Sequence, residues 1–213
     1  MKIAVFGASG AIGRQFVNLA LNDGHELYVY SRREINLPDP TKTKLFIGEL
    51  SDFEKINGTI KHADAVVSLL GPQLKFSYPG MPIASGHKNI IRAMKDQNVS
   101  RFITIATPAI KFEKDKTSII TVLPKVMARL FLNKPYKEIV AVGNLTKSSG
   151  LDWTIIRFLA PINGEPTGKV MVSFGDRKIR FKITRKDIAK FILQELTDKK
   201  YINSMPIIGS QRT

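Results

Sequence analysis

Residues 2–13 of this 213-residue chain read KIAVFGASGAIG, and this stretch decides the expected fold. Ile3–Phe6 is a continuous apolar run, which is typical of a strand buried in a parallel sheet. From residue 11 to residue 21, Ile12, Phe16 and Leu19 recur at helical spacing, so a helix should follow directly. The stretch therefore predicts a strand, a glycine-rich turn and a helix at the start of the chain.

The three glycines of this turn have separable tasks. One allows a tight turn, one lets the backbone approach a pyrophosphate, and one lets the helix pack closely on the strand. The helix N-terminus adds N–H groups and a partial positive charge, and a serine adds a hydroxyl. The spacing is G-x-x-G-x-x-G, although a purely structural turn could share it. We expect this turn to bind a dinucleotide through Gly7, Ser9, Gly10, Ala11, Ile12 and Gly13.

The end of the second predicted strand indicates which dinucleotide is bound. An acidic residue there would bind the ribose 2′-OH and select NAD(H). This chain instead has Arg32 and Arg33, with no acid before Glu34. Two guanidinium groups suit a 2′-phosphate through charge-assisted bonds. We predict NADP(H) in preference to NAD(H); the alternative is an ordinary pair of solvent-facing arginines.

Strand and helix patterns alternate along most of the chain. The predicted strands cover residues 3–6, 27–30, 44–47, 65–70, 101–105 and 153–157, and the predicted helices cover 11–21, 51–61, 84–96 and a segment ending at 149–150. This alternation is typical of a parallel sheet with helices on both faces. We therefore predict an α/β fold class, a Rossmann-type doubly wound sheet in one NAD(P)-binding domain over residues 1–213. Ligands of such sheets bind at the carboxyl ends of the strands.

The C-terminal part of the pattern predicts a small addition to this sheet. Lys169–Phe174 and Lys178–Phe181 flank a three-residue turn and predict a hairpin. Thr184 begins a capping-type sequence, so a helix should follow it. Tyr201–Ile208 is predicted as a last strand. We expect residues 158–185 to contribute the substrate-side lobe.

Composition excludes several classes of site. The chain has no cysteine and three unpaired histidines, so we expect no metal centre and no thiol chemistry. No apolar run is long enough to span a membrane, and no signal sequence is evident, so we expect a cytoplasmic protein. The net charge of +15 suits an anionic partner, but the basic residues are spread along the chain. Without a recognition-helix or aromatic-platform motif, we expect no nucleic-acid partner.

Six segments spread over nearly the whole chain match one family pattern: GASGAIG at 7–13, GELSD at 48–52, ADAVV at 63–67, RFITI at 101–105, SGLDWTIIR at 149–157 and ITRKDIA at 183–189. On these segments the chain resembles the atypical short-chain dehydrogenase/reductases. Within them it is similar to the NAD(P)H-binding group of NmrA-like proteins, biliverdin reductase B-like flavin reductases and NADH-flavin reductase-like proteins.

The resemblance implies further cofactor contacts. Glu49 and Leu50 match an acid-plus-apolar pair beside the adenine, with Glu where Asp is usual. Leu70 and Gly71 match the segment under the adenosine and ribose. Thr107 lies where the family often carries a serine near the nicotinamide, and Leu159 lies in the segment 158–161 that flanks the nicotinamide.

One expected element is missing. Carbonyl reductases of the wider superfamily use Tyr-x-x-x-Lys, in which the lysine lowers the tyrosine pKa for proton transfer. The five tyrosines here are followed at the fourth position by Arg32, Glu34, Pro82, Val140 and Met205. No catalytic residue can therefore be named from this pattern. We predict hydride transfer to a flavin or quinone, which can take its proton from water. The alternative is an NmrA-like sensor that binds NAD(P) without turnover, and either form could be a monomer or a homodimer.

Residues 118–131 form an apolar, methionine-containing stretch among many lysines. Pro124 suits the first turn of a helix running to about residue 132. A lid over the substrate cleft, a subunit interface and a helix on a membrane surface all fit this composition.

Overall fold

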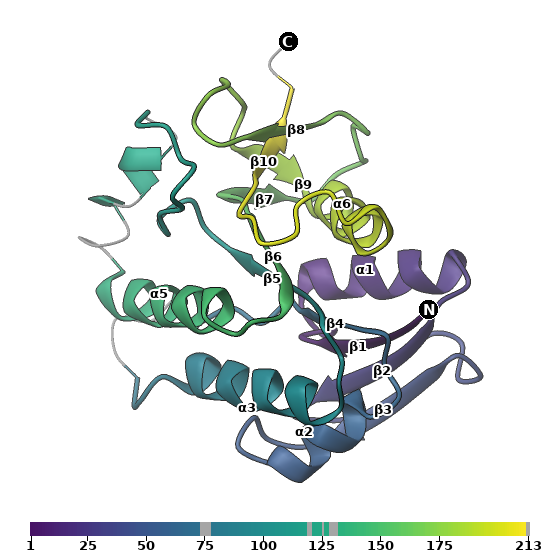
Figure 1. Cartoon of the computed structure of the whole chain (residues 1–213). Coiled ribbons are helices and arrows are strands. Elements are labelled where there is room, and N and C mark those ends of the chain that lie inside the picture. The colour runs from purple at the N-terminus through teal and green to yellow at the C-terminus, as the bar shows by residue number, and fades with distance from the viewer. Residues whose placement is uncertain (73–77, 119–120, 125, 128–131, 212–213) are drawn as a thin grey trace.

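A mostly parallel eight-stranded sheet forms the centre of the molecule in the computed structural model, which describes residues 1–72, 78–118, 121–124, 126–127 and 132–211 (Figure 1). The strand order is β3-β2-β1-β4-β5-β6-β10-β8, and β8 alone among them is antiparallel to its neighbour. The strands are β1 (Lys2–Phe6), β2 (Glu26–Ser31), β3 (Thr43–Ile47), β4 (Ala65–Ser68), β5 (Arg101–Ala106), β6 (Asp152–Arg157), β8 (Val170–Ser173) and β10 (Ile207–Ser210).

The first strand lies in the middle of this sheet because its side chains are apolar on both faces. Ile3, Ala4 and Val5 have no exposed surface. Val5 is paired with Val29 of β2 on one side and with Val67 of β4 on the other. The chain runs outward from β1 through β2 to β3 and then returns to β4 beside β1. This reversal of strand order creates a crevice at the carboxyl ends of β1 and β4, where ligands of doubly wound sheets bind.

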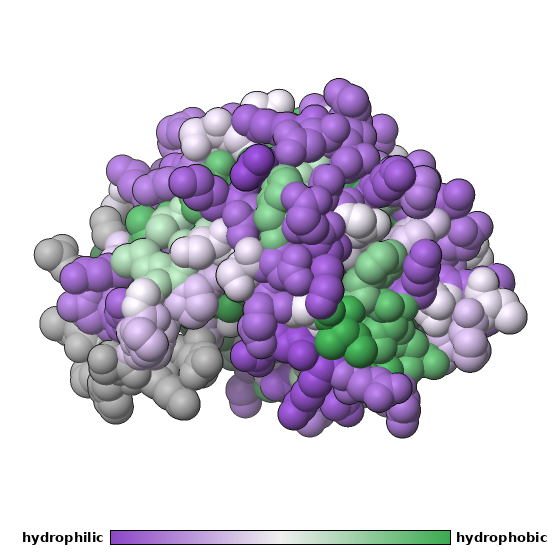
Figure 2. Space-filling model, turned by 90° about the horizontal axis from the view of Figure 1, so that it is seen from below, coloured by the Kyte–Doolittle hydropathy of each residue, from purple (hydrophilic) through white to green (hydrophobic). Residues whose placement is uncertain are grey.

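Helices cover both faces of the sheet (Figure 1). One face packs against α1 (Ala11–Asn22) and α6 (Arg185–Asp198), and their core includes Phe16 and Ile192. The opposite face packs against α2 (Phe53–Ile60), α3 (Pro82–Asp96) and α5 (Asn133–Lys147), and its core includes Ile90. Seen from the side that carries α2 and α3, the surface is largely hydrophilic, with hydrophobic residues gathered in limited patches (Figure 2). The predicted α/β fold, doubly wound in one domain, is confirmed.

The predicted hairpin between residues 169–174 and 178–181 is wrong, because these two segments do not pair with each other. The chain does reverse after β8, where Ser173 Oγ donates to the carbonyl of Arg177 at 2.9 Å. However, residues 178–181 form no strand with β8, because β10 lies between them and is the antiparallel partner of β8. Gly209 permits this arrangement, since a Cβ there would stand 2.1 Å from the carbonyl oxygen of Arg180. The last strand is therefore 207–210, whereas residues 201–203 form a turn.

Two short strands were not predicted. β7 (Ala160–Ile162) pairs in parallel with β9 (Lys182–Thr184) as a separate two-stranded sheet. Thr184 caps α6 as expected, and its hydroxyl accepts from the Asp187 N–H at 3.0 Å. Asp187 also accepts from the backbone N–H groups of Thr167 and Gly168 at 2.9 and 3.1 Å, so it holds the loop before β8 on this helix.

Two sequence predictions concern the stretch 118–131. Residues 121–124 and 126–127 are helical, so the helix begins before Pro124. The end predicted near residue 132 falls on 128–131, which lie outside the described residues. Among the residues that the structure describes, no helix is long and apolar enough to cross a membrane.

Candidate cofactor-binding site

The glycine turn joins the central strand β1 to helix α1. The Gly10 N–H donates to the Gly7 carbonyl at 3.1 Å, which closes the turn, and Gly10 is the N-cap residue of α1. No side chain caps this helix, and its first turn contains no acidic residue. The first N–H groups of a helix have no partner within it and carry a partial positive charge. The turn therefore presents an uncapped helix N-terminus at the carboxyl end of β1.

The three glycines have different surroundings. At Gly7 φ is +87°, and a Cβ would lie 2.8 Å from the Leu69 carbonyl carbon. At Gly13 a Cβ would lie 2.2 Å from the Gly7 carbonyl oxygen, so the helix could not approach the turn. At Gly10 a Cβ would meet one atom within 4 Å, the Gly7 carbonyl oxygen at 3.3 Å. Gly7 and Gly13 are therefore required by the fold, whereas Gly10 leaves free the space in front of the turn.

An arginine beside this turn was missed in the sequence pattern. Arg14 is exposed, and its Nε donates to the carbonyl of Ser9 at 3.2 Å. A cation in the first turn of a helix is electrostatically unfavourable unless an anion binds there. Ser9 and Ala11 are also exposed, and Ile12 is half-buried. Arg14 could have been identified from the sequence, because a basic residue directly after the third glycine lies in the first turn of the helix, where the pyrophosphate is expected.

The segment after β4 lies against the turn. Leu69 donates its N–H to the Phe6 carbonyl at 2.8 Å, and the Leu70 nitrogen would be 3.1 Å from a Cβ on Gly7. The structure therefore brings the predicted Leu70–Gly71 segment beside the glycine turn. Leu70 is half-buried and Gly71 is exposed.

The ends of β2 and β3 meet at the same edge of the sheet. The Gly48 N–H donates to the Ser31 carbonyl at 3.0 Å, and the Tyr30 hydroxyl donates to the Glu49 carbonyl at 2.7 Å. Burial, reinforced by the nearby carboxylates of Asp52 and Glu49, raises the Tyr30 pKa to about 12, so this hydroxyl keeps its proton. Glu49 is thus held beside the Ser31–Arg33 segment.

The neighbouring Leu50 is positioned from α3. Its carbonyl accepts from Asn89 Nδ2 at 2.8 Å. Its side chain packs directly against Gly86, because a Cβ on Gly86 would lie only 2.7 Å from Leu50 Cδ1. Arg32 and Arg33 are exposed, and no carboxylate among the described residues forms an ion pair with either of them. Two uncompensated guanidinium groups therefore lie beside the predicted adenine segment.

The last two predicted residues lie farther along the same edge. The Phe158 N–H donates to the Ala106 carbonyl at 3.2 Å, which joins the ends of β5 and β6. Thr107 follows β5 and is half-buried, whereas Leu159 follows β6 and is 38% exposed. All the predicted residues thus lie at the carboxyl edge of the sheet, as the strand order requires. Within the described part of the chain, no cluster of three or more histidine or acidic side chains could hold a metal ion.

A buried hydrogen-bond network around a histidine lies between α3 and the strands β4 and β5. The sequence pattern did not reveal it. His87 of α3 has no exposed surface. Its Nδ1 lies 2.8 Å from the Ile83 carbonyl, so Nδ1 carries the proton. Its Nε2 then accepts from the hydroxyls of Ser68 and Thr104, at 3.0 and 3.2 Å. The network therefore ties α3 to the carboxyl halves of β4 and β5.

A second buried group holds the start of α3. Glu138 of α5 has no exposed surface, and it accepts from the backbone N–H groups of Ile83 and Ala84 at 2.6 and 3.2 Å. Its other oxygen accepts from the Tyr78 hydroxyl at 2.5 Å. Burial, together with the adjacent Glu138 carboxylate, raises the Tyr78 pKa to about 12. Glu138 therefore caps α3 and anchors Tyr78 beside the start of this helix.

The histidine network predicts a loss of stability in mild acid. Burial lowers the pKa of His87 from 6.5 to about 4, against the smaller opposing effects of the Ile83 carbonyl and the Glu138 charge. Below pH 6.5 the unfolded chain takes up a proton that the folded chain excludes until about pH 4. The free energy of unfolding should therefore decrease by about 3 kcal/mol, through this histidine alone, as the pH falls from 6.5 to about 4.

The measurement is denaturant unfolding across the same window for the native chain and for His87→Gln. The variant should be less stable at neutral pH, because its amide cannot reproduce both sides of the network. Its stability should also fall less steeply with acid, since the group that gains the proton is absent. Parallel curves for the two proteins would contradict the assignment.

Comparisons with known proteins agree with this geometry. Residues 7–199 match the protein-family model described as NAD(P)H-binding. Pinoresinol reductase 2 of Arabidopsis thaliana is 25% identical over 95% of this chain, and the chain spans 66% of that relative's length. A short-chain dehydrogenase/reductase of Veillonella parvula, solved in complex with NADP, has a TM-score of 0.79 at 17% identity, covering 100% of this chain and 95% of that one.

A further solved structure has the same fold. ChuY, an anaerobillin reductase from Escherichia coli O157:H7, has a TM-score of 0.77 at 16% identity, covering 100% of this chain and 98% of the neighbour. The family match begins at the first glycine of the turn and extends through α6, so it includes every candidate site residue. The chain belongs to the NAD(P)H-binding family of Rossmann-fold proteins.

Proposed function

We propose that this protein is an NADPH-dependent reductase whose acceptor is a flavin or a quinone. The observation that carries the cofactor half is the open turn at Gly10 beside two exposed arginines, neither of which forms an ion pair with a carboxylate of the described residues. The reductase class is supported by relatives and neighbours that are themselves named as reductases. When bound, the cofactor supplies a hydride to the acceptor.

The residues at the carboxyl edge fit such a cofactor. The turn from Gly7 to Gly13 and the uncapped N-terminus of α1 would bind the pyrophosphate, with Arg14 as an added cation. Arg32 and Arg33 would bind the 2′-phosphate, while the Glu49–Leu50 and Leu70–Gly71 segments would flank the adenosine. Thr107 and Leu159, after β5 and β6, would flank the nicotinamide.

The proposal that the acceptor is a flavin or a quinone is supported by the hydrogen bonds and pKa values of the tyrosines. The hydroxyls of Tyr30 and Tyr78 donate to Glu49 and Glu138, and both have pKa values raised to about 12. Neither is therefore suited to give up a proton, and no tyrosine belongs to a Tyr-x-x-x-Lys pair. A flavin or quinone accepts hydride and takes its proton from water. The segment 158–185, which β7 and β9 draw together, would form the substrate-side lobe.

We expect the native protein to bind NADPH more tightly than NADH. Arg32→Ala combined with Arg33→Ala should weaken NADPH binding by about 2–4 kcal/mol, because two charge-assisted contacts with the 2′-phosphate are lost. NADH binding should barely change. Calorimetry with both cofactors makes the comparison, and Arg177→Ala with Lys178→Ala removes the same charge elsewhere as the control. Equal native affinities for NADPH and NADH would disprove this role.

We expect turnover with flavin or quinone acceptors and none with plain ketones. A general acid typically contributes about 10²–10⁴-fold, so its absence would cripple carbonyl reduction. Tyr136 of α5 lies near the usual tyrosine region, and Tyr136→Phe should leave the rate of NADPH oxidation almost unchanged. A large loss of rate in this variant, or rapid reduction of a ketone, would reveal a proton donor. Tight NADPH binding without turnover of any acceptor would instead favour the dinucleotide-sensing function.

A further inference from the structure

Four exposed apolar side chains lie close together outside the cofactor site. Val122, Leu123, Val126 and Met127 are each 46–48% exposed, and they make up half of the large hydrophobic residues exposed in the described structure. Residues 122 and 126, like 123 and 127, are four apart in helical backbone, so they share one side of the segment. We call these four residues the apolar ridge.

The ridge is held in place and is not simply a loose loop. Pro124 within it is buried against the molecule. The Ser118 carbonyl accepts from the N–H groups of Thr121 and Val122 at 3.1 and 2.9 Å, which starts the helical turn. The Lys116 N–H donates to the Phe174 carbonyl at 2.7 Å, so the preceding loop is joined to the turn that follows β8. Backbone hydrogen bonds and a buried proline therefore hold the ridge against the rest of the protein.

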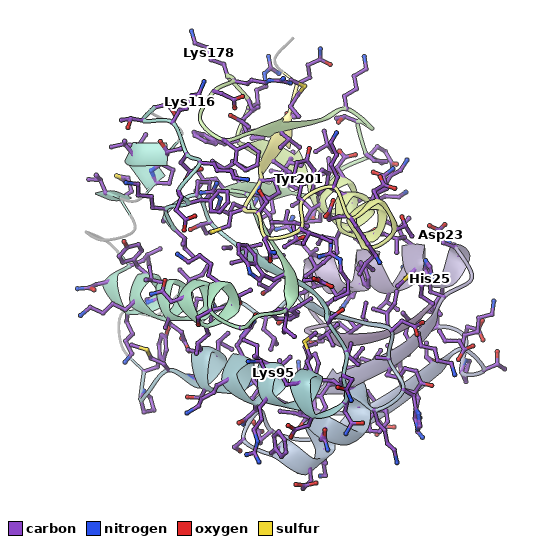
Figure 3. All side chains as sticks on the ribbon, viewed as in Figure 1. Asp23, His25, Lys95, Lys116, Lys178 and Tyr201 are labelled. Atoms are coloured by element: carbon purple, nitrogen blue, oxygen red, sulfur yellow. The ribbon has the colours of Figure 1, made fainter. Side chains whose placement is uncertain are left out.

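Several basic residues lie in the two segments that adjoin the ridge. Lys111, Lys114 and Lys116 precede it, and Arg177 and Lys178 lie in the turn joined to Lys116; we call these five the basic rim. Figure 3 shows Lys116 and Lys178 projecting outward at the same corner of the molecule.

Most of the acids in these segments are already paired. Asp115 is buried and bidentate with Arg157, while Asp176 pairs with Arg177; Glu113 remains an exposed acid. The net charge of the whole chain, +15, has the same sign as the rim.

A hollow of about 400 Å³ lies where ridge and rim meet. Its lining includes Val122 and Val126 of the ridge and Lys111 and Lys116 of the rim. Asp115 also lines it, but its carboxylate is paired with Arg157. Thr117 and Thr121 add hydroxyl groups. Apolar and cationic groups therefore face one space, and the acid in its lining is already neutralised by an ion pair.

We propose that the apolar ridge and the basic rim dock this protein on an anionic phospholipid surface. Aliphatic residues that enter the acyl boundary and lysines that contact acidic headgroups are the two elements of a peripheral membrane contact. A protein partner fits less well, because protein interfaces favour aromatic residues and arginine and are depleted in lysine. A second copy would bring two basic rims together, which like-charge repulsion opposes.

The test is co-sedimentation of the full chain with vesicles of phosphatidylcholine alone or mixed with phosphatidylglycerol. The protein should sediment with the anionic vesicles at low salt, and high salt should release it. Leu123→Glu should weaken this partition at least about ten-fold, since a leucine would no longer be buried. Lys111→Glu with Lys116→Glu should weaken it about 25-fold, at about five-fold for each lysine lost from the surface.

The chain offers matched controls. Ile47→Glu changes another apolar residue of similar exposure, 44%, on the edge strand β3, and Lys61→Glu with Lys95→Glu reverses two exposed lysines on the α2–α3 side. Both controls should sediment as the native chain does. The thermal unfolding of all variants should be unchanged, because the altered side chains are exposed.

Three results would overturn the proposal. Equal sedimentation with both kinds of vesicle, or with neither, would exclude an anionic lipid surface. Binding that the two-lysine variant loses but Leu123→Glu retains would show that charge alone attracts the protein to the vesicles. Release of the protein from the vesicles by duplex DNA would then show that any polyanion can replace the lipid. A dimer detected by sedimentation velocity and dissociated by Leu123→Glu would assign the ridge to a second copy.

Discussion

Gly10→Val is expected to lower the affinity for NADPH by at least about 100-fold while the fold remains intact. The turn presents its backbone to the space in front of α1, and a Cβ at Gly10 would meet one protein atom within 4 Å, at 3.3 Å. The branched side chain would occupy the position that a pyrophosphate needs. Loss of two charge-assisted hydrogen bonds to the helix N-terminus corresponds to about 3 kcal/mol, which is about 100-fold in binding.

Gly13→Ala provides the contrasting variant. Its Cβ would lie 2.2 Å from the Gly7 carbonyl oxygen and 2.7 Å from Ala8 Cα, so the helix must move away from the turn. This variant should lose about 1–3 kcal/mol of unfolding free energy, whereas Gly10→Val should lose little. Calorimetry with NADPH and denaturant unfolding separate the two effects. If Gly10→Val bound NADPH with near-native affinity, the turn would not be a phosphate site.

Arg157→Met is expected to destabilise the fold by about 3–5 kcal/mol, because it leaves a buried carboxylate without its partner. Arg157 ends β6 with no exposed surface, and it donates to both oxygens of Asp115, at 2.7 and 2.6 Å. It also donates to the carbonyls of Ile110 and Met205, each at 2.8 Å. These bonds join the segment after β5 to the segment before β10, so their loss should loosen the loop that carries Thr107.

Thermal or denaturant unfolding measures this effect. The melting temperature should fall by about 10 °C or more for a chain of this size. Arg92→Met is the matched control, because Arg92 pairs with Asp96 at 3.8 Å while 67% exposed. An exposed pair contributes at most about 1 kcal/mol, so the control should unfold close to the native chain. Similar losses in the two variants would show that burial of Arg157 does not matter.

The regular part of the fold was predictable because each element carries its own periodic pattern. The strand at 2–6, the helix at 11–22 and the capped start of α6 follow from neighbouring residues alone. The same holds for the position of the glycine turn and of the two arginines after β2. The C-terminal pairing was predicted wrongly, because β10 inserts between segments that are neighbours in sequence. Local patterns contain no information about a strand that arrives some thirty residues later.

The sequence by itself determined the strand–turn–helix unit, the alternation that builds a doubly wound sheet and the segments expected at its carboxyl edge. Those features depend on backbone preferences and on the spacing of apolar residues, which act over a few positions. Only the tertiary structure decided which polar groups are buried and with which partners. His87, Glu138 and Arg157 look like ordinary surface residues in the sequence, yet each has no exposed surface and bonds to distant segments. Burial is a property of the assembled layers, so the desolvation that lowers the His87 pKa exists only once α3 packs on the sheet.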